Sequence, residues 1–147
     1  MDNCEQLDSS TLLDSSTLLD SSTLLDIKLK NIANEIYKEL GPGHRECVYH
    51  RAFEIELRNR WIDYECEVVV PLFYKGHFVS HLRLDLVVAK TYIIELKATK
   101  SVKDDDTSQL KRYMHTTNIP RGVVINFGNT SNIEFFLCTN KDAYDKT

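Results

Sequence analysis

The 147-residue sequence contains no apolar run that approaches the roughly 20 residues needed to span a bilayer. Its N-terminus lacks the basic and then apolar pattern of a secretory signal. Its four cysteines are scattered, with no C-x-x-C pair and no zinc-type spacing, and its histidines show no metal-ligand spacing. We therefore expect a soluble intracellular protein, cytoplasmic or nuclear, with no membrane partner and with reduced, mostly buried thiols.

Lysine and arginine are absent from residues 1–26, which hold six acids. Removing these six from the total of 22 acids leaves 16 acids against 18 bases, so the remaining chain carries about +2 although the whole carries −4. A mildly basic body permits contact with a phosphate backbone without requiring it. No recognition helix or zinc finger is evident, so base-specific contact would need a homodimer or a partner protein.

A hexapeptide, LDSSTL, occurs three times without change over residues 7–24. Identity this complete indicates a recent tandem duplication, and three short copies cannot bury a core of their own. We therefore assign residues 1–25 to an acidic tail, either flexible or a frayed extension of the helix that follows. A tail that mimics nucleic acid and shields a basic face is the alternative hypothesis.

Residues 26–147 are long enough and apolar enough for one domain.

Helical and strand patterns alternate along that domain. Apolar spacing predicts a helix from Asp26, as N-cap, to Gly41-Pro42, and a second helix that ends at about Asn59. Strands are predicted over residues 65–74, 78–88, 92–97, 122–127 and 133–138, with a third helix from 106 or 107 to 116. The last nine residues have the composition of a frayed polar tail.

Two of the predicted strands carry positional information. Pro71 indicates that its strand lies at an edge or contains a bulge, because proline cannot donate to a ladder. The continuous apolar run over 122–127 indicates a strand covered on both faces. The order of elements favours an α/β (α+β) fold with one mixed sheet of about five strands flanked by helices.

Charges interrupt the two apolar runs on either side of Lys90, where buried strands should have none. If the chain reverses at Lys90, Asp85 lies opposite Glu95, and alternation places Arg83, Asp85 and Val87 on one face. Opposed carboxylates about 5 Å apart repel, so something must compensate them. A divalent cation would do so. The alternative is an ion-pair cluster in which Arg83 and Lys97 neutralise the acids, and we disfavour it because desolvating such a cluster is costly.

Three further polar side chains lie on the predicted helices. Glu46 falls on the same stripe as Tyr49 and Phe53, in the first turn of the second helix. The residues alone leave open whether Glu46 serves a site or only benefits from the helix dipole. Gln109 and Tyr113 stand four apart and share one face of the third helix.

The pattern D…ExK across a hairpin, formed by Asp85, Glu95 and Lys97, resembles the PD-(D/E)xK nuclease superfamily, with Leu84 where a proline usually precedes the aspartate. Residues 43–49 spell GxxExxY, and the chain is similar to the GxxExxY family within that superfamily over about residues 27–128. The other matching segments are Leu40-Gly41-Pro42-Gly43, Tyr74-Lys75-Gly76, Arg83-Leu84-Asp85, Gln109-Leu110 with Tyr113, and Ile125-Asn126-Phe127-Gly128. Each segment is weak alone, and their order and spacing carry the resemblance.

The resemblance implies a restriction-endonuclease-like core and a metal-dependent phosphodiesterase site. Asp85 and Glu95 would hold Mg²⁺ or Mn²⁺, with the backbone carbonyl of Leu96 completing the protein's share. Glu46 would join them as a further ligand, directly or through water.

The catalytic roles follow from the same resemblance. Lys97 would orient or help deprotonate the attacking water and stabilise the transition state. Gln109 and Tyr113 would contact the scissile phosphate or brace Lys97. The leading hypothesis is thus a nuclease with DNA as its expected substrate; RNA or another phosphodiester is a further candidate. The alternative from another class is a catalytically silent nucleic-acid-binding or assembly protein that retains the nuclease fold.

Overall fold

The structure is a computed structural model that describes residues 3–6 and 20–139. Its strands form one mixed sheet in the order β1-β6-β5-β4-β3-β2, in which β4 and β5 are parallel and the other neighbours are antiparallel. The strands are β1 (Asn3–Gln6), β2 (Tyr64–Tyr74), β3 (His77–Val88), β4 (Tyr92–Lys97), β5 (Arg121–Asn126) and β6 (Glu134–Thr139), and the helices are α1 (Ser21–Leu40), α2 (Glu46–Asn59) and α3 (Asp104–Thr117). The predicted mixed α/β (α+β) architecture is confirmed, and β1 adds a strand that the sequence did not predict.

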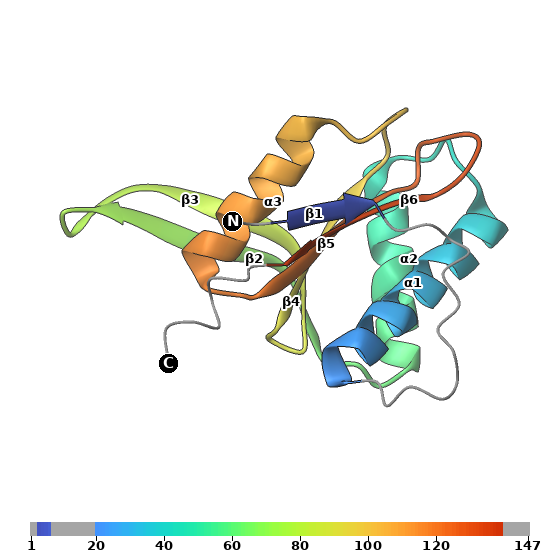
Figure 1. The fold of residues 1–147 in the computed structure, drawn as a ribbon, viewed down its shortest axis with the longest axis horizontal. Helices are drawn as coiled ribbons and strands as arrows, with labels where there is room; N and C mark the ends of the chain where they lie inside the picture. Colours follow the sequence, from blue (N-terminus) through green and yellow to red (C-terminus); the bar gives the residue numbers. More distant parts are fainter. Residues whose placement is uncertain (1–2, 7–19, 140–147) are drawn as a thin grey trace.

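The sheet is sandwiched between helices, with α1 and α2 on one face and α3 on the other (Figure 1). Alternation along β4 shows this division, because Ile94 and Leu96 pack with α1 and α2 while Ile93 packs with α3. Every residue of β5 from Gly122 to Asn126 is buried, which confirms the predicted strand covered on both faces. The strand that contains Pro71, β2, lies at the edge of the sheet, as predicted.

Helix α1 begins earlier than the sequence predicted. Its N-cap is Asp20, whose Oδ1 accepts a hydrogen bond from the Thr23 N–H at 2.8 Å, so residues 21–25 of the predicted tail belong to the helix. The prediction of Asp26 as N-cap is therefore wrong. The third LDSSTL copy supplies a complete cap, with an acceptor three residues before a free amide, ahead of the amphipathic stretch. Hydrogen bonds from Thr23 and Ser22 lower the pKa of Asp20 to about 2. The first two copies, and the predicted tail beyond 139, lie outside the described residues.

The cysteines depart from the prediction of reduced, mostly buried thiols. Cys4 on β1 and Cys138 on β6 are directly opposite in the register and form a disulfide. They are 134 residues apart in the chain, so only the pairing of β1 with β6 brings them together. The other two, Cys47 and Cys66, are free but exposed.

No helix within the described part of the chain is long and apolar enough to cross a bilayer.

Asp26 joins α1 to the sheet. Its Oδ1 accepts hydrogen bonds from the Tyr92 hydroxyl at 2.6 Å and from Nε of Arg121 at 3.2 Å, and its Oδ2 pairs with the same guanidinium. Burial and the Asp26 carboxylate together raise the pKa of the Tyr92 hydroxyl. One carboxylate inside the helix therefore satisfies two polar groups from β4 and β5.

We expect Asp26→Ala to lower the free energy of unfolding by about 2 kcal/mol or more, because it leaves a buried hydroxyl and a guanidinium without their acceptor. Urea denaturation followed by circular dichroism would measure the change. Glu39→Ala, at an exposed carboxylate on the same helix, is the matched control. Equal midpoints for the two variants would contradict the assigned role.

Candidate active site

The backbone ladder between β3 and β4 stops at the charged residues. Its register pairs Val88 with Tyr92 and ends with Leu86 opposite Ile94, which agrees with the predicted reversal centred on Lys90. Beyond that pair, side chains replace the backbone ladder.

Asp85 and Glu95 bridge the gap where the strands separate. The Asp85 N–H donates to Glu95 Oε1 at 3.3 Å, and the Leu96 N–H donates to Asp85 Oδ2 at 2.9 Å. Each carboxylate is thus held by a backbone amide, so the pair is fixed to the rigid part of the sheet. The two carboxylates therefore lie next to each other, as predicted.

The alternation of β3 changes side at this point. Leu84 packs in the cluster under α3, whereas Leu86, two residues on, packs in the cluster under α1 and α2. Glu67, which lies across from Asp85 on β2, has a positive φ of 51°, a backbone twist that L-residues rarely adopt. The prediction that places Asp85 and Val87 on one face is therefore wrong: Val87 packs against α3, and Asp85 faces a cleft beside α2.

That cleft has a volume of about 490 Å³. It lies between α2 and the adjoining parts of β2 and β3, and most of the residues that line it have polar or charged side chains. The lining residues are Glu46, Cys47, His50, Arg51, Glu54, Cys66, Glu67 and Asp85.

Glu46 reaches the cleft because a tight loop ends α1 and starts α2. Gly43 has a φ of +104°, which favours glycine, and Glu46 is the first residue of α2. The fully buried Tyr49 fixes this loop: its hydroxyl donates to the Gly41 carbonyl at 2.6 Å, and its ring stacks on Phe127 with centroids 4.5 Å apart. Gly43 and Tyr49 of the GxxExxY motif therefore position Glu46 at the cleft. Partial burial and the nearby Asp85 carboxylate raise the pKa of Glu46.

Glu95 is the most strongly perturbed acid of the site. Its side chain is only 4% exposed, and burial, followed by the charge of Asp85, raises its pKa to about 9. Without a compensating cation, Glu95 therefore keeps a proton at neutral pH. Asp85 is less buried and lies at the cleft surface.

Both the side chain and the backbone of Lys97 are held by neighbouring groups. Its Nζ lies 3.7 Å from Asp106 Oδ1, and its backbone carbonyl accepts from the Phe127 N–H at 2.9 Å. Asp106 Oδ2 also accepts from the Lys103 N–H at the start of α3, so one carboxylate ties the lysine to that helix. This argues against the ion-pair-cluster alternative, because Lys97 pairs with Asp106, and Arg83 pairs with Glu67 at 2.9 Å.

Tyr113 and Gln109 approach from α3. Tyr113 is 8% exposed, and burial together with the charges of Glu95 and Asp85 raises its pKa, so its hydroxyl lies within electrostatic reach of both acids. Gln109 is half-buried one turn earlier on the same helix. Its contact with phosphate or with Lys97 stays a prediction.

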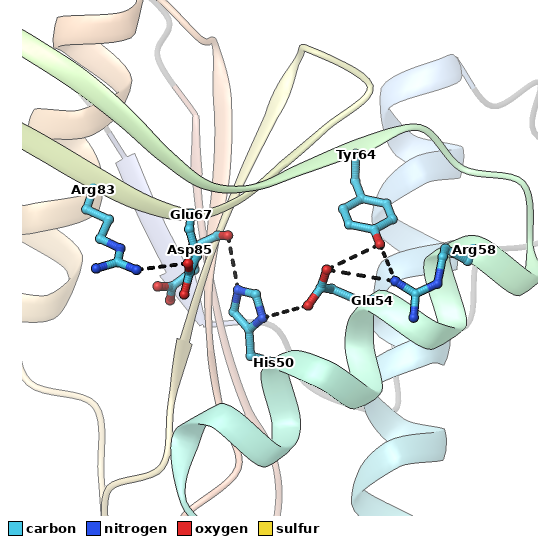
Figure 2. Close-up of polar contacts among 7 residues, drawn as sticks. All are labelled: His50, Glu54, Arg58, Tyr64, Glu67, Arg83 and Asp85. Atoms are coloured by element: carbon cyan, nitrogen blue, oxygen red, sulfur yellow. Dashed lines mark hydrogen bonds and ion pairs between the residues drawn. The ribbon is translucent and has the colours of Figure 1, made fainter.

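His50 takes a position that sequence reasoning missed (Figure 2). Its Nε2 lies 3.2 Å from the backbone carbonyl of Asp85, and its Nδ1 lies 3.2 Å from Glu54 Oε2. Both partners are acceptors, so the two bonds form together only when the imidazole carries both protons. The spacing of Glu46, His50 and Glu54, four residues apart, could have revealed this stripe of α2.

The contacts of Glu54 continue toward the edge of the sheet. Its Oε1 lies 3.3 Å from the Tyr64 hydroxyl, which also accepts from Arg58 at 2.6 Å (Figure 2). A continuous line of polar contacts therefore joins the backbone of Asp85 to the start of β2.

Asn126, fully buried at the end of β5, is a second residue whose role the sequence left open. Its Oδ1 accepts from the N–H groups of Thr99 and Gly128, and its Nδ2 donates to the Thr99 carbonyl at 2.9 Å. A Cβ on Gly128 would lie 2.2 Å from the Thr99 carbonyl oxygen, so only glycine allows this approach. Asn126 and Gly128 thus anchor the segment that follows Lys97.

No three histidine, cysteine, aspartate or glutamate side chains within residues 3–6 and 20–139 converge closely enough to hold a metal ion as they stand. The donor set nevertheless suits a hard divalent cation, because Asp85, Glu95 and Glu46 offer carboxylate oxygens. The raised pKa values of Glu46 and Glu95 have the repulsion of Asp85 as a shared cause, and a cation would relieve it.

The sequence profile of the PD-(D/E)XK nuclease superfamily matches residues 25–135, which is more than half of the chain. The protein therefore belongs to the PD-(D/E)XK nuclease superfamily.

A solved structure shows the same fold. The crystal structure of SSO0001 superposes with a TM-score of 0.51 and 19% sequence identity, over 79% of this chain and 56% of the other. At this identity the similarity concerns the fold alone, and the chain spans just over half the length of that protein. No curated protein matches the chain significantly.

We expect the metal-free protein to lose stability as the pH rises from about 4.5 towards 9, because folded Glu95 keeps a proton that the unfolded chain releases. The free energy of unfolding should fall with a slope of up to about 1.4 kcal/mol per pH unit in this window. Urea denaturation in EDTA at several pH values would measure it. Glu95→Gln should lose this slope and the exposed-site control Glu65→Gln should keep it; equal slopes for wild type and Glu95→Gln would contradict the assignment.

Proposed function

We propose that this protein is a metal-dependent nuclease of the GxxExxY type that hydrolyses phosphodiester bonds, with DNA as the expected substrate. The observation that supports this most is the pair Asp85 and Glu95, placed where the β3–β4 ladder ends and followed two residues later by Lys97. Two opposed carboxylates would hold a cation that binds an anionic phosphoryl group, and the nearby lysine would contact the same group.

Asp85 and Glu95 would hold Mg²⁺ or Mn²⁺, with the carbonyl of Leu96 and with Glu46 from α2. When bound, the cation would supply a water of lowered pKa and neutralise charge on the phosphoryl oxygens. Glu95 must release its proton to serve as a ligand, so we expect the affinity for the cation to rise with pH.

Lys97 presents a positive charge whose position is set before substrate arrives. Its ammonium is partly buried and tied to Asp106, and little reorganisation is needed for it to orient the attacking water and stabilise charge that develops on the phosphoryl group. Tyr113 and Gln109 would contact the scissile phosphate or brace Lys97. His50 would position Asp85 through its backbone carbonyl, at 3.2 Å.

We expect purified protein to cleave DNA only when Mg²⁺ or Mn²⁺ is present, and Asp85→Asn to lower the rate on the order of 100-fold or more by removing an anionic ligand. The assay uses linear, nicked, circular and single-stranded DNA and an RNA strand. Calorimetric titration with Mn²⁺ should show weakened binding to Asp85→Asn. Asp63→Asn, an exposed aspartate at the α2–β2 connection, controls for the change of charge. An Asp85→Asn variant as active as wild type would defeat the proposal, as would failure to cleave any of these substrates.

The alternative, a binding or assembly protein without turnover, is favoured by one observation. The carboxylates of Asp85 and Glu95 are already hydrogen-bonded to the opposite strand, at 2.9 and 3.3 Å. Such a protein would bind nucleic acid without metal and would cut none.

Lys97→Ala separates the catalytic role of this lysine from its contribution to DNA binding. For a nuclease, we expect this variant to lose cleavage while its affinity for DNA in EDTA changes less than about tenfold, because one phosphate contact contributes only part of the electrostatic term. Lys100→Ala, at an exposed lysine three residues on, should keep both properties. Cleavage that survives Lys97→Ala would exclude the assigned role of this lysine.

A further inference from the structure

The hairpin of β2 and β3 extends well beyond the body of the fold (Figure 1). We define the arm as residues 68–84. At its base, Val68, Val70 and Leu82 pack against the cluster under α3. Towards the tip, the side chains of residues 77–81 are all exposed. The base of the arm therefore belongs to the core, whereas its outer part contributes little to the core and needs another explanation.

The register defines an outer face that points away from α3. Val69 pairs with Arg83, and Pro71 pairs with His81, on the face opposite to the one that packs at the base. A register shift between Leu72 and Phe73 brings Phe78 opposite Phe73, and their rings meet edge to face with centroids 6.2 Å apart. The outer face thus comprises Val69, Pro71, Phe73, Phe78, His81 and Arg83.

Aromatic rings gather at the tip of the arm in contact with solvent. Phe73, Tyr74 and Phe78 are 63%, 62% and 62% exposed. Single exposed apolar residues are ordinary, but several large rings together on a projecting hairpin mark a binding surface. Lys75 lies 5.4 Å from the centroid of the Tyr74 ring, so a cation accompanies these rings.

The arm also differs from the whole chain in charge. Residues 68–84 contain no aspartate or glutamate, and they hold Lys75 and Arg83 as well as His77 and His81. The chain as a whole carries −4. Beyond the ion pair of Arg83 with Glu67, the surface combines exposed aromatic rings with the cation of Lys75 and holds no acid, so it is complementary to a polyanion with flat, stackable groups.

The outer face continues into the active-site cleft. Arg83, at its base, pairs with Glu67 at 2.9 Å, and Glu67 lines the same cleft as Asp85. Figure 2 shows Arg83, Glu67 and Asp85 next to one another, opposite His50 of α2. A strand lying along the outer face would therefore arrive at the candidate catalytic acids.

Several features disfavour a second copy of the chain as the occupant of this surface. Edge strands pair with other chains when their backbone donors and acceptors are regular and free. Along β2, Pro71 lacks an N–H, the register is irregular between Leu72 and Phe73, and Glu67 has a positive φ. These features interrupt the edge through which two copies would add to one sheet.

We propose that the outer face of the arm, with Tyr74 and Lys75 at its tip, binds an unpaired segment of the nucleic-acid substrate and leads it to the cleft. Bases stack on Phe73, Phe78 and Tyr74, and backbone phosphates lie near Lys75 and Arg83. This inference rests on the proposed function, whose substrate it narrows to strands with single-stranded character. Stacking tolerates any sequence, which agrees with a chain that has no recognition helix.

The test measures binding apart from cleavage. Fluorescence anisotropy with a labelled oligothymidylate in EDTA should show binding by wild type, and Phe73→Ala/Phe78→Ala should weaken it at least about tenfold through the loss of base stacking. Trp61→Ala removes a ring that is 95% exposed but lies outside the arm, and it should bind as wild type does. Circular dichroism and the unfolding midpoint check that the double variant folds.

A second variant tests the charges without touching the rings. Lys75→Gln/Arg83→Gln should reduce the slope of log affinity against log salt by about 1.4, which corresponds to two phosphate contacts on a single strand. Unchanged slope and affinity in this variant, together with unchanged affinity in the phenylalanine variant, would overturn the proposal. So would a wild type that does not bind the oligothymidylate, or one that binds only a duplex of the same length.

Two further measurements separate this inference from the proposed function. If sedimentation shows a wild-type dimer that Phe73→Ala/Phe78→Ala converts to a monomer, the arm joins copies of the chain and the proposal is wrong. If the arm binds the oligonucleotide but the protein cleaves nothing with Mg²⁺ or Mn²⁺, the proposed function fails and the arm's role stands. If wild type and Phe73→Ala/Phe78→Ala cleave single-stranded DNA with equal KM, the arm's role fails and the nuclease assignment stands.

Discussion

Two carboxylates held against each other at the end of a backbone ladder are the constraint on which the rest of this structure depends. Asp85 and Glu95 replace ladder hydrogen bonds with contacts to backbone amides, and the burial of Glu95 makes a second negative charge costly. Replacing buried charged groups by well-packed apolar residues is often neutral or stabilising. The electrostatic cost is instead retained where the strands separate and Asp85 faces a cleft, so a cation bound there would relieve the repulsion.

The surrounding elements each support that pair through a specific contact. Tyr49 locks the loop that presents Glu46, and His50 of α2 reaches the backbone of Asp85. From the other side, Asp106 of α3 holds the ammonium of Lys97, and Asn126 of β5 anchors the segment beyond it. The site is therefore assembled from elements packed on both faces of the sheet, and their packing determines its geometry.

Local patterns predicted the elements well because their causes are local. Helical apolar spacing, Pro71 at an edge and the doubly covered β5 depend on neighbours in the chain, and the structure bears them out. The errors arose where a distant partner decides the outcome. Asp26 is a capable N-cap by type, but Asp20 already fills that role and Asp26 is committed to Tyr92 and Arg121. The alternation of β3 likewise fails beside the positive φ of Glu67 on the neighbouring strand.

The sequence by itself determined the superfamily, through a resemblance carried by the order and spacing of its motifs. It also determined the register of the β3–β4 hairpin, and with it the opposition of Asp85 and Glu95, because a short reversal centred on Lys90 suffices for both. Only the tertiary structure decided that Lys97 pairs with Asp106, that His50 joins the site and that Cys4 meets Cys138. It also showed that the rings of the arm are exposed and that Arg83, at the base of the arm, pairs with Glu67 of the cleft. Residue types reveal which chemistry a chain can perform, but solvent exposure and contacts between distant segments exist only once the sheet has formed.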